Sequence, residues 1–201
     1  MIIGLTGTYC SGKNYIAGFL KKRGLPVLDV DRLGHKAIET EKNLITSRFG
    51  NDILNADGTV SRKLLGEKVF GKPGELADLE GIIHPRVNLE TDAWIKTHNG
   101  KPCVINAALL HRSSSFASFN ALIIVRAPVL TRLLRAKKRD KLPWKEIIKR
   151  VYSQKNFLSQ YFSKKADIYI VENPGFPYFG FRRSLKPEDR INEILSLLGL
   201  D

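Results

Sequence analysis

Residues 4–14 of this 201-residue chain read Gly-Leu-Thr-Gly-Thr-Tyr-Cys-Ser-Gly-Lys-Asn. Within this stretch, four residues separate Gly7 from Gly12, and Lys13 follows directly. The spacing matches the phosphate-binding pattern G-x-x-x-x-G-K-[S/T] at every position except the last, where Asn14 stands. An apolar segment precedes the stretch and an apolar-periodic segment follows it, so we expect a strand, a glycine loop and a helix in that order.

The residue types of this loop suit the binding of a nucleoside triphosphate. Glycines allow a tight turn that brings backbone N–H groups against phosphate oxygens, and the helix that follows adds its N-terminal donors. Lys13 can reach the β- and γ-phosphates, and the next residue usually supplies a hydroxyl ligand to Mg²⁺. The side-chain oxygen of Asn14 is also an acceptable Mg²⁺ ligand, although it is longer and differently aimed. The alternative is a glycine-rich turn that binds no ligand.

The length and composition predict one globular domain with an inserted or appended subdomain. Apolar residues make up 43% of the chain, which is ordinary for a protein with a buried core. We expect no membrane-spanning helix, because no run of about 18 apolar residues occurs, and no signal peptide, because the glycine loop begins almost at once. Cys10 and Cys103 form no metal-binding spacing and are expected to be buried thiols, so we expect a cytoplasmic protein.

Positive charge is concentrated in one part of the chain. The formal net charge is +13, and residues 132–165 contain twelve Lys and Arg against two acids, Asp140 and Glu146. Such a block suits a polyanionic partner, which could be nucleotide phosphates, nucleic acid or an acidic surface. For any single lysine the simpler interpretation is a solvated helix face.

Strands alternate with helices along the chain, which predicts an α/β fold with a doubly wound, parallel, five-stranded sheet. No strand is expected between residues 32 and 98, which should form a helical subdomain. Pro85 lies inside the last helix of that subdomain and should kink or restart it near His84. The expected strands are residues 2–5, 25–31, 101–106, 121–125 and 166–171, and the main expected helices are residues 14–22, 75–98, 128–139, 142–161 and 187–198.

Two aspartates follow the second expected strand. Asp29 and Asp31 are two positions apart, so on a continuing strand both point to the same face. Ligands of open α/β sheets bind at the carboxyl ends of the strands, which makes Asp31 a candidate for the site. The alternative is that Asp31 caps a helix that starts at Arg32.

Several motifs, taken in order, resemble the dephospho-coenzyme A kinase family over nearly the whole chain. The most specific is the combination of Asp29-x-Asp31 with His84-Pro85. The others are the glycine loop, Arg48-Phe-Gly50, Asp57-Gly58 with Arg62, Ala108-Leu-Leu110, Arg150-Val-Tyr-Ser-Gln154, and Ala166-Asp167 with Asn173.

The resemblance implies a P-loop NTPase fold and ATP-dependent phosphorylation of the ribose 3′-hydroxyl of dephospho-CoA, the final step of CoA synthesis. It also implies a core of residues 1–31, 99–131 and 166–201, a helical CoA-side subdomain of about residues 32–98, and a basic helical lid of about residues 132–165. ATP and Mg²⁺ are the expected cofactors and dephospho-CoA the expected partner. We expect a monomer with no nucleic-acid or membrane partner.

The resemblance also assigns roles to individual residues. Asp31 would accept the proton of the attacking hydroxyl, and Arg139, with Arg135 and Arg150, would close over the phosphates. Lys13 would be catalytic as well as ATP-binding, and Asn14 would be the metal ligand. Besides Asp31, the acceptor side would include Arg62 and His84, for which the alternatives are a solvated arginine and a helix-breaking His-Pro step. The implied ATP-binding residues are Gly7, Cys10, Ser11, Gly12, Lys13, Asn14, Tyr15, Arg135 and Asn173.

The chain departs from the family pattern at several positions. Asn14 replaces the hydroxyl residue, and Thr8-Tyr9-Cys10 replaces a usually small, glycine-rich stretch. Ala108 replaces a usual proline, Arg112 falls near a usual acid, and residues 176–186 look inserted. These departures leave three alternatives open. They are a kinase of another acceptor such as a nucleoside, a nucleic-acid-binding P-loop protein that uses the basic block, and a degenerate kinase that binds ligand without turnover.

Overall fold

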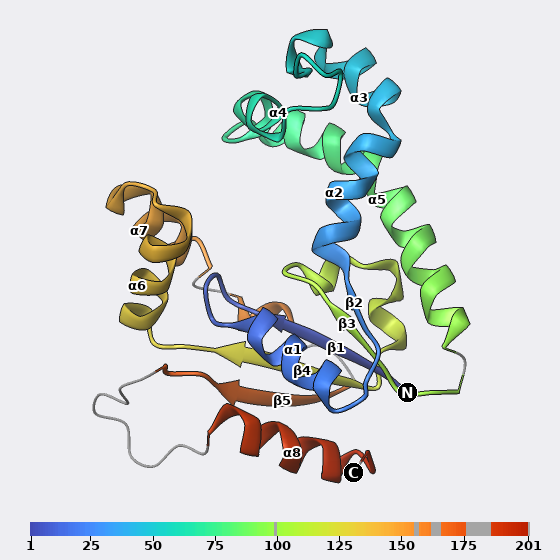
Figure 1. Cartoon of the computed structure of the whole chain (residues 1–201), viewed down its shortest axis with the longest axis vertical. Helices are drawn as coiled ribbons and strands as arrows, with labels where there is room; N and C mark the ends of the chain where they lie inside the picture. Colours follow the sequence, from blue (N-terminus) through green and yellow to red (C-terminus); the bar gives the residue numbers. More distant parts are fainter. Residues whose placement is uncertain (99, 155–156, 162–165, 176–185, 201) are drawn as a thin grey trace. The chain divides into compact units, whose positions relative to one another are not determined.

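The computed structural model describes residues 1–98, 100–154, 157–161, 166–175 and 186–200 (Figure 1). The chain divides into two compact units. The first, called the sheet unit here, comprises Met1–Leu28 and His98–Asp201, and the second, called the helical unit, comprises Asp29–Thr97. In the described part of the chain, none of the helices combines the length and the apolar character needed to cross a bilayer.

The sheet unit is built on a five-stranded sheet with the strand order β2-β3-β1-β4-β5. The central strand β1 pairs in parallel with β3 and β4, and β4 pairs in parallel with β5. This confirms the expected fold class. The strands are β1 (Ile2–Gly7), β2 (Val27–Asp29), β3 (Cys103–Asn106), β4 (Ala121–Arg126) and β5 (Asp167–Glu172). Strands β2, β3 and β5 begin later than expected from the sequence, and β2 also ends two residues earlier.

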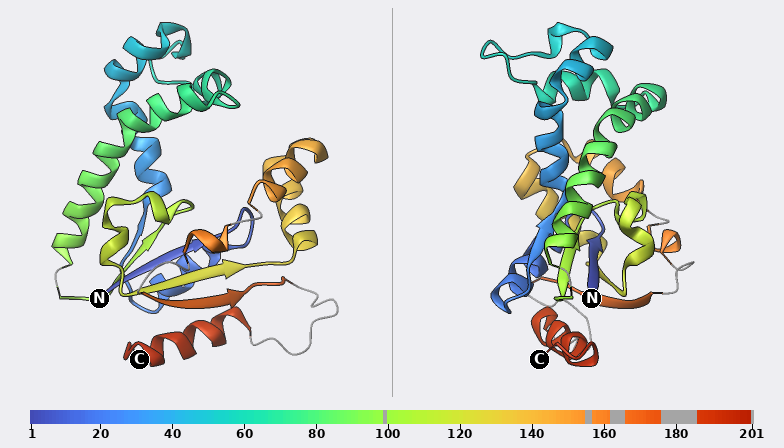
Figure 2. Two further views of the ribbon diagram at one scale, coloured as in Figure 1. Left: turned by 180° about the vertical axis from the view of Figure 1, so that it is seen from behind. Right: turned by 90° about the vertical axis from the view of Figure 1, so that its right-hand side faces the viewer.

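One face of the sheet is covered by α1 (Lys13–Lys22) and α8 (Pro187–Leu197). Alternate residues of β1, Ile3 and Leu5, are fully buried in the same apolar cluster as residues of these two helices. Figure 2 shows α8 running beside β5. The loop between β1 and α1 lies at the carboxyl end of β1 because it follows that strand in the chain, and packing of α1 in this cluster holds the helix against the sheet.

The basic segment forms two helices, α6 (Val129–Asp140) and α7 (Trp144–Tyr152). The expected helix over residues 142–161 is therefore wrong in its second half. A separate 3₁₀ turn, Leu158–Gln160, follows α7, and it is flanked by Phe157 and Tyr161. Both rings are buried, and they pack against each other with centroids 5.2 Å apart. Burial of the two aromatic rings favours this turn over a continuation of α7, since packing can override the helix propensity of a segment.

The helical unit contains four α-helices in its described residues. They surround an apolar cluster that includes Ile45, Phe49, Ile53 and Leu65. Outside the cluster, the side chain of Arg48 forms an ion pair of 2.6 Å with Asp78. The helices are α2 (Val30–Thr40), α3 (Lys42–Phe49), α4 (Arg62–Val69) and α5 (Pro73–Thr97).

Of the two outcomes expected at Pro85, a kink or a restart of α5 near His84, the restart is wrong, because the helix runs through Pro85 without a break. A proline removes one backbone hydrogen bond and crowds the carbonyl group four residues before it, which here belongs to Gly81. Both Pro85 and Gly81 are exposed to solvent. Water can therefore solvate the carbonyl group that the proline leaves unbonded, and the helix continues.

Candidate active site

The loop between β1 and α1 has the conformation of an anion-binding nest. Cys10 (φ 60°) and Gly12 (φ 94°) both adopt left-handed backbone angles, and the N–H of Ser11 donates to the carbonyl of Thr8 at 2.9 Å. Left-handed residues alternating with right-handed ones turn successive N–H groups toward one concave side. A side chain at Gly7 would lie 2.6 Å from the carbonyl oxygen of Val125, so the loop can leave β1 only through a glycine.

The outward-facing carbonyl groups of the loop are held by side chains from distant parts of the sheet unit. The Nε of Arg132 donates to the carbonyl of Tyr9 at 2.9 Å. The carbonyl of Ser11 accepts from the side-chain amide of Asn173 at 2.9 Å and from the Nη1 of Arg135 at 3.0 Å. These bonds stabilise the loop in its binding conformation before any ligand arrives, which reduces the ordering cost of binding.

Gly12 is the tightest position in the site. A Cβ atom there would lie 2.1 Å from the Nδ2 of Asn173, and its left-handed φ disfavours any other residue. We predict that Gly12→Ala lowers stability by about 2 kcal/mol or more and the Tm by roughly 4–8 °C, with loss of ATP binding. Gly18→Ala, in α1, is the matched control, because nothing lies within 4 Å of a Cβ there and alanine favours the helix. Calorimetric Tm values and ATP titrations measure both changes. A Gly12→Ala protein that binds ATP as the wild type does would contradict the prediction.

Three arginines at i, i+3 and i+7 lie along α6, and they play different parts. Arg132 is only 7% exposed and Arg135 is partly buried, and burial lowers the pKa of both guanidinium groups. Both still carry charge at neutral pH, because arginine starts from so high a pKa. Arg139 remains at the surface, where the carboxylate of Asp140 accepts from its Nε at 2.6 Å and raises its pKa. Arg132 and Arg135 therefore support the loop, whereas Arg139 remains open to a ligand.

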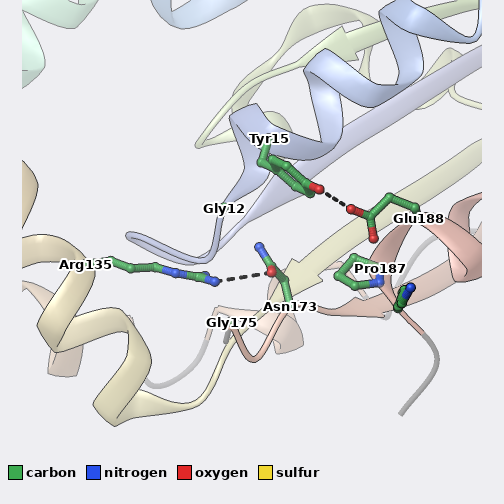
Figure 3. A pocket seen from close by; sticks show the side chains of 8 residues that line it. Gly12, Tyr15, Arg135, Asn173, Gly175, Pro187 and Glu188 are labelled. Carbon is green, nitrogen blue, oxygen red and sulfur yellow. Dashed lines mark hydrogen bonds between the residues drawn. The ribbon is translucent and has the colours of Figure 1, made fainter. Parts of the chain in front are cut away.

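A pocket of about 410 Å³ opens beside the start of α1 (Figure 3). The hydroxyl of Tyr15, from α1, donates to the carboxylate of Glu188, from α8. This hydrogen bond joins two walls of the pocket. The side-chain oxygen of Asn173 accepts from the Nη2 of Arg135 at 3.2 Å, which holds the segment after β5 against α6. The lining residues are Gly12, Tyr15, Arg135, Asn173, Gly175, Lys186, Pro187 and Glu188.

The structure brings most of the residues of the expected ATP site together. Gly7, Ser11 and Gly12 shape the loop, while Tyr15, Arg135 and Asn173 border the pocket. Cys10 contributes its left-handed backbone, and burial raises the pKa of its thiol, so the group is protonated and unreactive at neutral pH. Lys13 and Asn14 occupy the first two positions of α1.

Sequence reasoning did not single out Arg132, Gln154 and Asn106. The Oε1 of Gln154 accepts from the N–H of Tyr9 at 2.6 Å, and Asn106, at the end of β3, donates from Nδ2 to the Oδ1 of Asn14 at 3.4 Å. The helical spacing of Arg132 relative to the two other arginines of α6 was an available signal. Gln154 ends the motif Arg150-Val-Tyr-Ser-Gln154, but no role was assigned to it, and for Asn106 no local pattern was available.

The residues expected on the acceptor side all belong to the helical unit. Arg62 is the exposed first residue of α4, and His84 lies half-buried in α5. Asp31 is exposed in the first turn of α2, two residues beyond the end of β2. The region from residue 176 to 185, which the sequence marked as an insertion, lies outside the described residues.

The expectation that Asp29 and Asp31 share one strand face is wrong, and so is the alternative that Asp31 caps the helix. The strand ends at Asp29, and the side chain of Asp29 accepts from the N–H of Arg32 at 3.3 Å. Asp29 is therefore the cap of α2. Because α2 begins at Val30, Asp31 lies on a helical turn, where residues two apart do not face the same way.

The sheet unit has a parallel five-stranded sheet, a glycine nest between the central strand and a helix, and a lysine as the first residue of that helix. Together these features define a P-loop nucleotide-binding protein. The arginines of α6 beside the loop, and the pocket next to it, are what a phosphoryl-transfer enzyme of this class requires.

The comparisons identify the family within this class. The family model for dephospho-CoA kinase matches residues 1–176. A dephospho-CoA kinase from Dehalococcoides mccartyi is 32% identical over 158 residues, which cover 76% of this chain and 80% of that protein. One from Treponema denticola is 33% identical over 186 residues, covering 86% and 82%. The crystal structure of TT1252 from Thermus thermophilus matches with a TM-score of 0.81 and 27% identity, covering 100% of this chain and 98% of that one. The chain belongs to the dephospho-CoA kinase family.

Proposed function

We propose that this protein transfers the γ-phosphoryl group of ATP to the ribose 3′-hydroxyl of dephospho-CoA, giving CoA and ADP. The observation that carries the proposal is the loop of residues 7–14, which is held in a phosphate-binding conformation in a chain of the dephospho-CoA kinase family. Phosphoryl transfer depends mainly on positioning and on neutralising charge, and the loop and the arginines of α6 supply both.

On the donor side, the loop amides and Lys13 would hold the β- and γ-phosphates of ATP. The pocket beside Tyr15 and Asn173 would receive the base, because it adjoins the loop and has an apolar wall at Pro187. Arg139 would contact the transferring phosphoryl group, since its guanidinium is at the surface and its side chain is 61% exposed.

On the acceptor side, we propose that Asp31 accepts the proton of the attacking hydroxyl and that Arg62 and His84 bind dephospho-CoA. The helical unit would then be the acceptor-binding subdomain, and α6 and α7 would belong to the lid expected over residues 132–165.

The residues at the end of β3 and the start of α1 fit a magnesium ion. Among the described residues, no cluster of three or more His, Cys, Asp or Glu side chains is placed to hold a metal. Mg²⁺ bound with nucleotide needs few protein ligands, because phosphates and water supply the rest, and it neutralises phosphate charge. Asn14 would provide an amide oxygen. Asn106 donates to that oxygen, and its own Oδ1 is a buried acceptor with no protein partner in the described part of the chain.

We predict that the affinity for Mg²⁺ changes when the amide at position 14 is replaced with a hydroxyl. Asn14→Thr restores a hydroxyl, which is shorter and aimed as in the usual pattern, so we expect Mg²⁺ to bind about three- to tenfold more tightly in the ADP complex. Binding of Mn²⁺, followed by electron paramagnetic resonance, and Mg²⁺ titrations of turnover measure this change. Asn192→Thr, an exposed site on α8, is the control. Weaker activation by Mg²⁺ in Asn14→Thr would show that the amide is the better ligand here.

The decisive test of the function is incubation with ATP, Mg²⁺ and dephospho-CoA, followed by detection of CoA by mass spectrometry. We expect a product heavier by one phosphoryl group, formed with one equivalent of ADP. Nucleosides and nucleoside monophosphates tested in the same ADP-release assay distinguish a kinase of another acceptor. ATP binding without product from any acceptor would contradict the proposal.

A further inference from the structure

Tyr9, the third residue of the glycine loop, links the loop to the end of α6. Its hydroxyl donates to the carboxylate of Asp140, the last residue of α6, and the guanidinium of Arg139 lies over its ring, 5.2 Å from the ring centroid. Its backbone is held on both sides, since its N–H donates to Gln154 at 2.6 Å and its carbonyl accepts from Arg132 at 2.9 Å. The ring therefore has a defined position at the edge of the loop.

This arrangement leaves Arg139 little freedom. Asp140 accepts from its Nε at 2.6 Å and from its Nη2 at 3.1 Å, and the Tyr9 ring lies against the guanidinium plane. Both contacts are favourable for a planar cation, which binds carboxylates through two N–H groups and stacks on aromatic faces. The hydroxyl of Tyr9 in turn fixes Asp140. Burial raises the pKa of Tyr9, so its hydroxyl remains a donor at neutral pH.

An arginine that acts on a transferring phosphoryl group must be aimed before the reaction, because a flexible side chain loses entropy when it is ordered. Arg139 keeps 61% of its side chain exposed although two partners hold it. We propose that Tyr9 is a positioning residue, which holds Arg139 beside the glycine loop so that it meets the terminal phosphate of ATP. This inference rests on the proposed function, in which Arg139 contacts that phosphate.

The test is a double-mutant cycle between Tyr9 and Arg139 in the full-length protein. Tyr9→Leu removes the ring and the hydroxyl and is expected to lower kcat about 10- to 30-fold, with a smaller rise in KM for ATP. Tyr9→Phe keeps the ring and should lower kcat only about two- to fivefold, which makes it the matched control for packing. Arg139→Ala alone should lower kcat by about 10²–10³-fold. In the Arg139→Ala protein, adding Tyr9→Leu should lower kcat by a further factor of less than about three, because no guanidinium remains to be positioned.

Affinity for labelled ATP and ADP gives a second measurement that needs no acceptor. The preference for ATP over ADP should fall in Tyr9→Leu and in Arg139→Ala, and should fall no further in the double variant. If dephospho-CoA is not phosphorylated but this pattern holds, the proposed acceptor is wrong and the role of Tyr9 stands.

Two results would overturn the inference. If Tyr9→Leu lowers kcat by the same factor with and without Arg139, Tyr9 acts on the loop alone. If Arg139→Ala keeps both its turnover and its ATP preference, there is no role for Tyr9 to support, and the part given to Arg139 in the proposed function is also wrong. In either case, an ADP affinity close to that of the wild type shows that a variant, Tyr9→Phe included, remains folded.

Discussion

Replacing Lys13 with alanine is expected to lower kcat for phosphoryl transfer from ATP to dephospho-CoA by at least about 10²–10³-fold. Lys13 is the first residue of α1, directly after the left-handed Gly12, so its backbone belongs to the phosphate-binding end of the helix. An ammonium group at this point neutralises charge on the β- and γ-phosphate oxygens while the bond between them breaks. Water cannot replace a positive charge that is already in place, so the loss should lie mainly in kcat.

Rates of ADP release with dephospho-CoA measure this loss, and calorimetric titration with ADP shows whether the loop still binds nucleotide. Lys22→Ala, in the last turn of α1, is the matched control because it removes a lysine charge from the other end of the helix, where the side chain is exposed. Its turnover should remain within about twofold of the wild type, since exposed charges at that distance are largely screened. Turnover of Lys13→Ala within tenfold of the wild type would contradict the role of the lysine.

Replacing Asp31 with asparagine is expected to lower kcat by about 10²–10⁴-fold while ATP affinity stays within about threefold. Asparagine has nearly the same shape as aspartate but cannot accept a proton, so the change removes the base and leaves the volume of the side chain. The helix itself should survive, because Asp29 caps α2 and Asp31 only lies in its first turn.

The change at Asp31 also removes a negative charge near a helix N-terminus, which by itself costs about 0.3–1 kcal/mol of stability. Asp189→Asn is the matched control, because Asp189 is likewise exposed in the first turn of a helix, α8. The control should share the small loss of stability and keep full turnover. An unchanged kcat in Asp31→Asn would remove Asp31 from the role of base and leave the phosphate loop unaffected.

Much of the fold was predictable from local patterns. The loop of residues 7–14, the five strands and the helical character of residues 32–97 all follow from spacing, periodicity and turn residues. The errors occurred where tertiary contacts or solvent changed the local preference. The chain leaves α7 at Tyr152, so that Phe157 and Tyr161 can be buried, and α5 passes through Pro85, where the helix is exposed.

The candidate site was less predictable. The place of Lys13 and Asn14 at the start of α1 could be predicted because it depends on a short spacing. The capping of α2 could not be assigned correctly, because Asp29 and Asp31 are chemically identical and only the end of the strand distinguishes them. Gln154 ends a motif that resembles the family, but nothing in the neighbouring sequence indicates that its side chain meets the N–H of Tyr9.

Eleven residues near the N-terminus were enough to specify a phosphate loop, because backbone dihedral preferences and helix periodicity act over a few positions and can be recognised in a linear pattern. The side chains that hold that loop could not be predicted from such a local pattern. Asn173 lies 162 residues from the carbonyl of Ser11 that it binds, and Arg132 lies 123 residues from that of Tyr9. Such partners meet only because parallel pairing places β4 beside β1 and β5 beside β4, and the order of strands in a sheet depends on the packing of the whole unit.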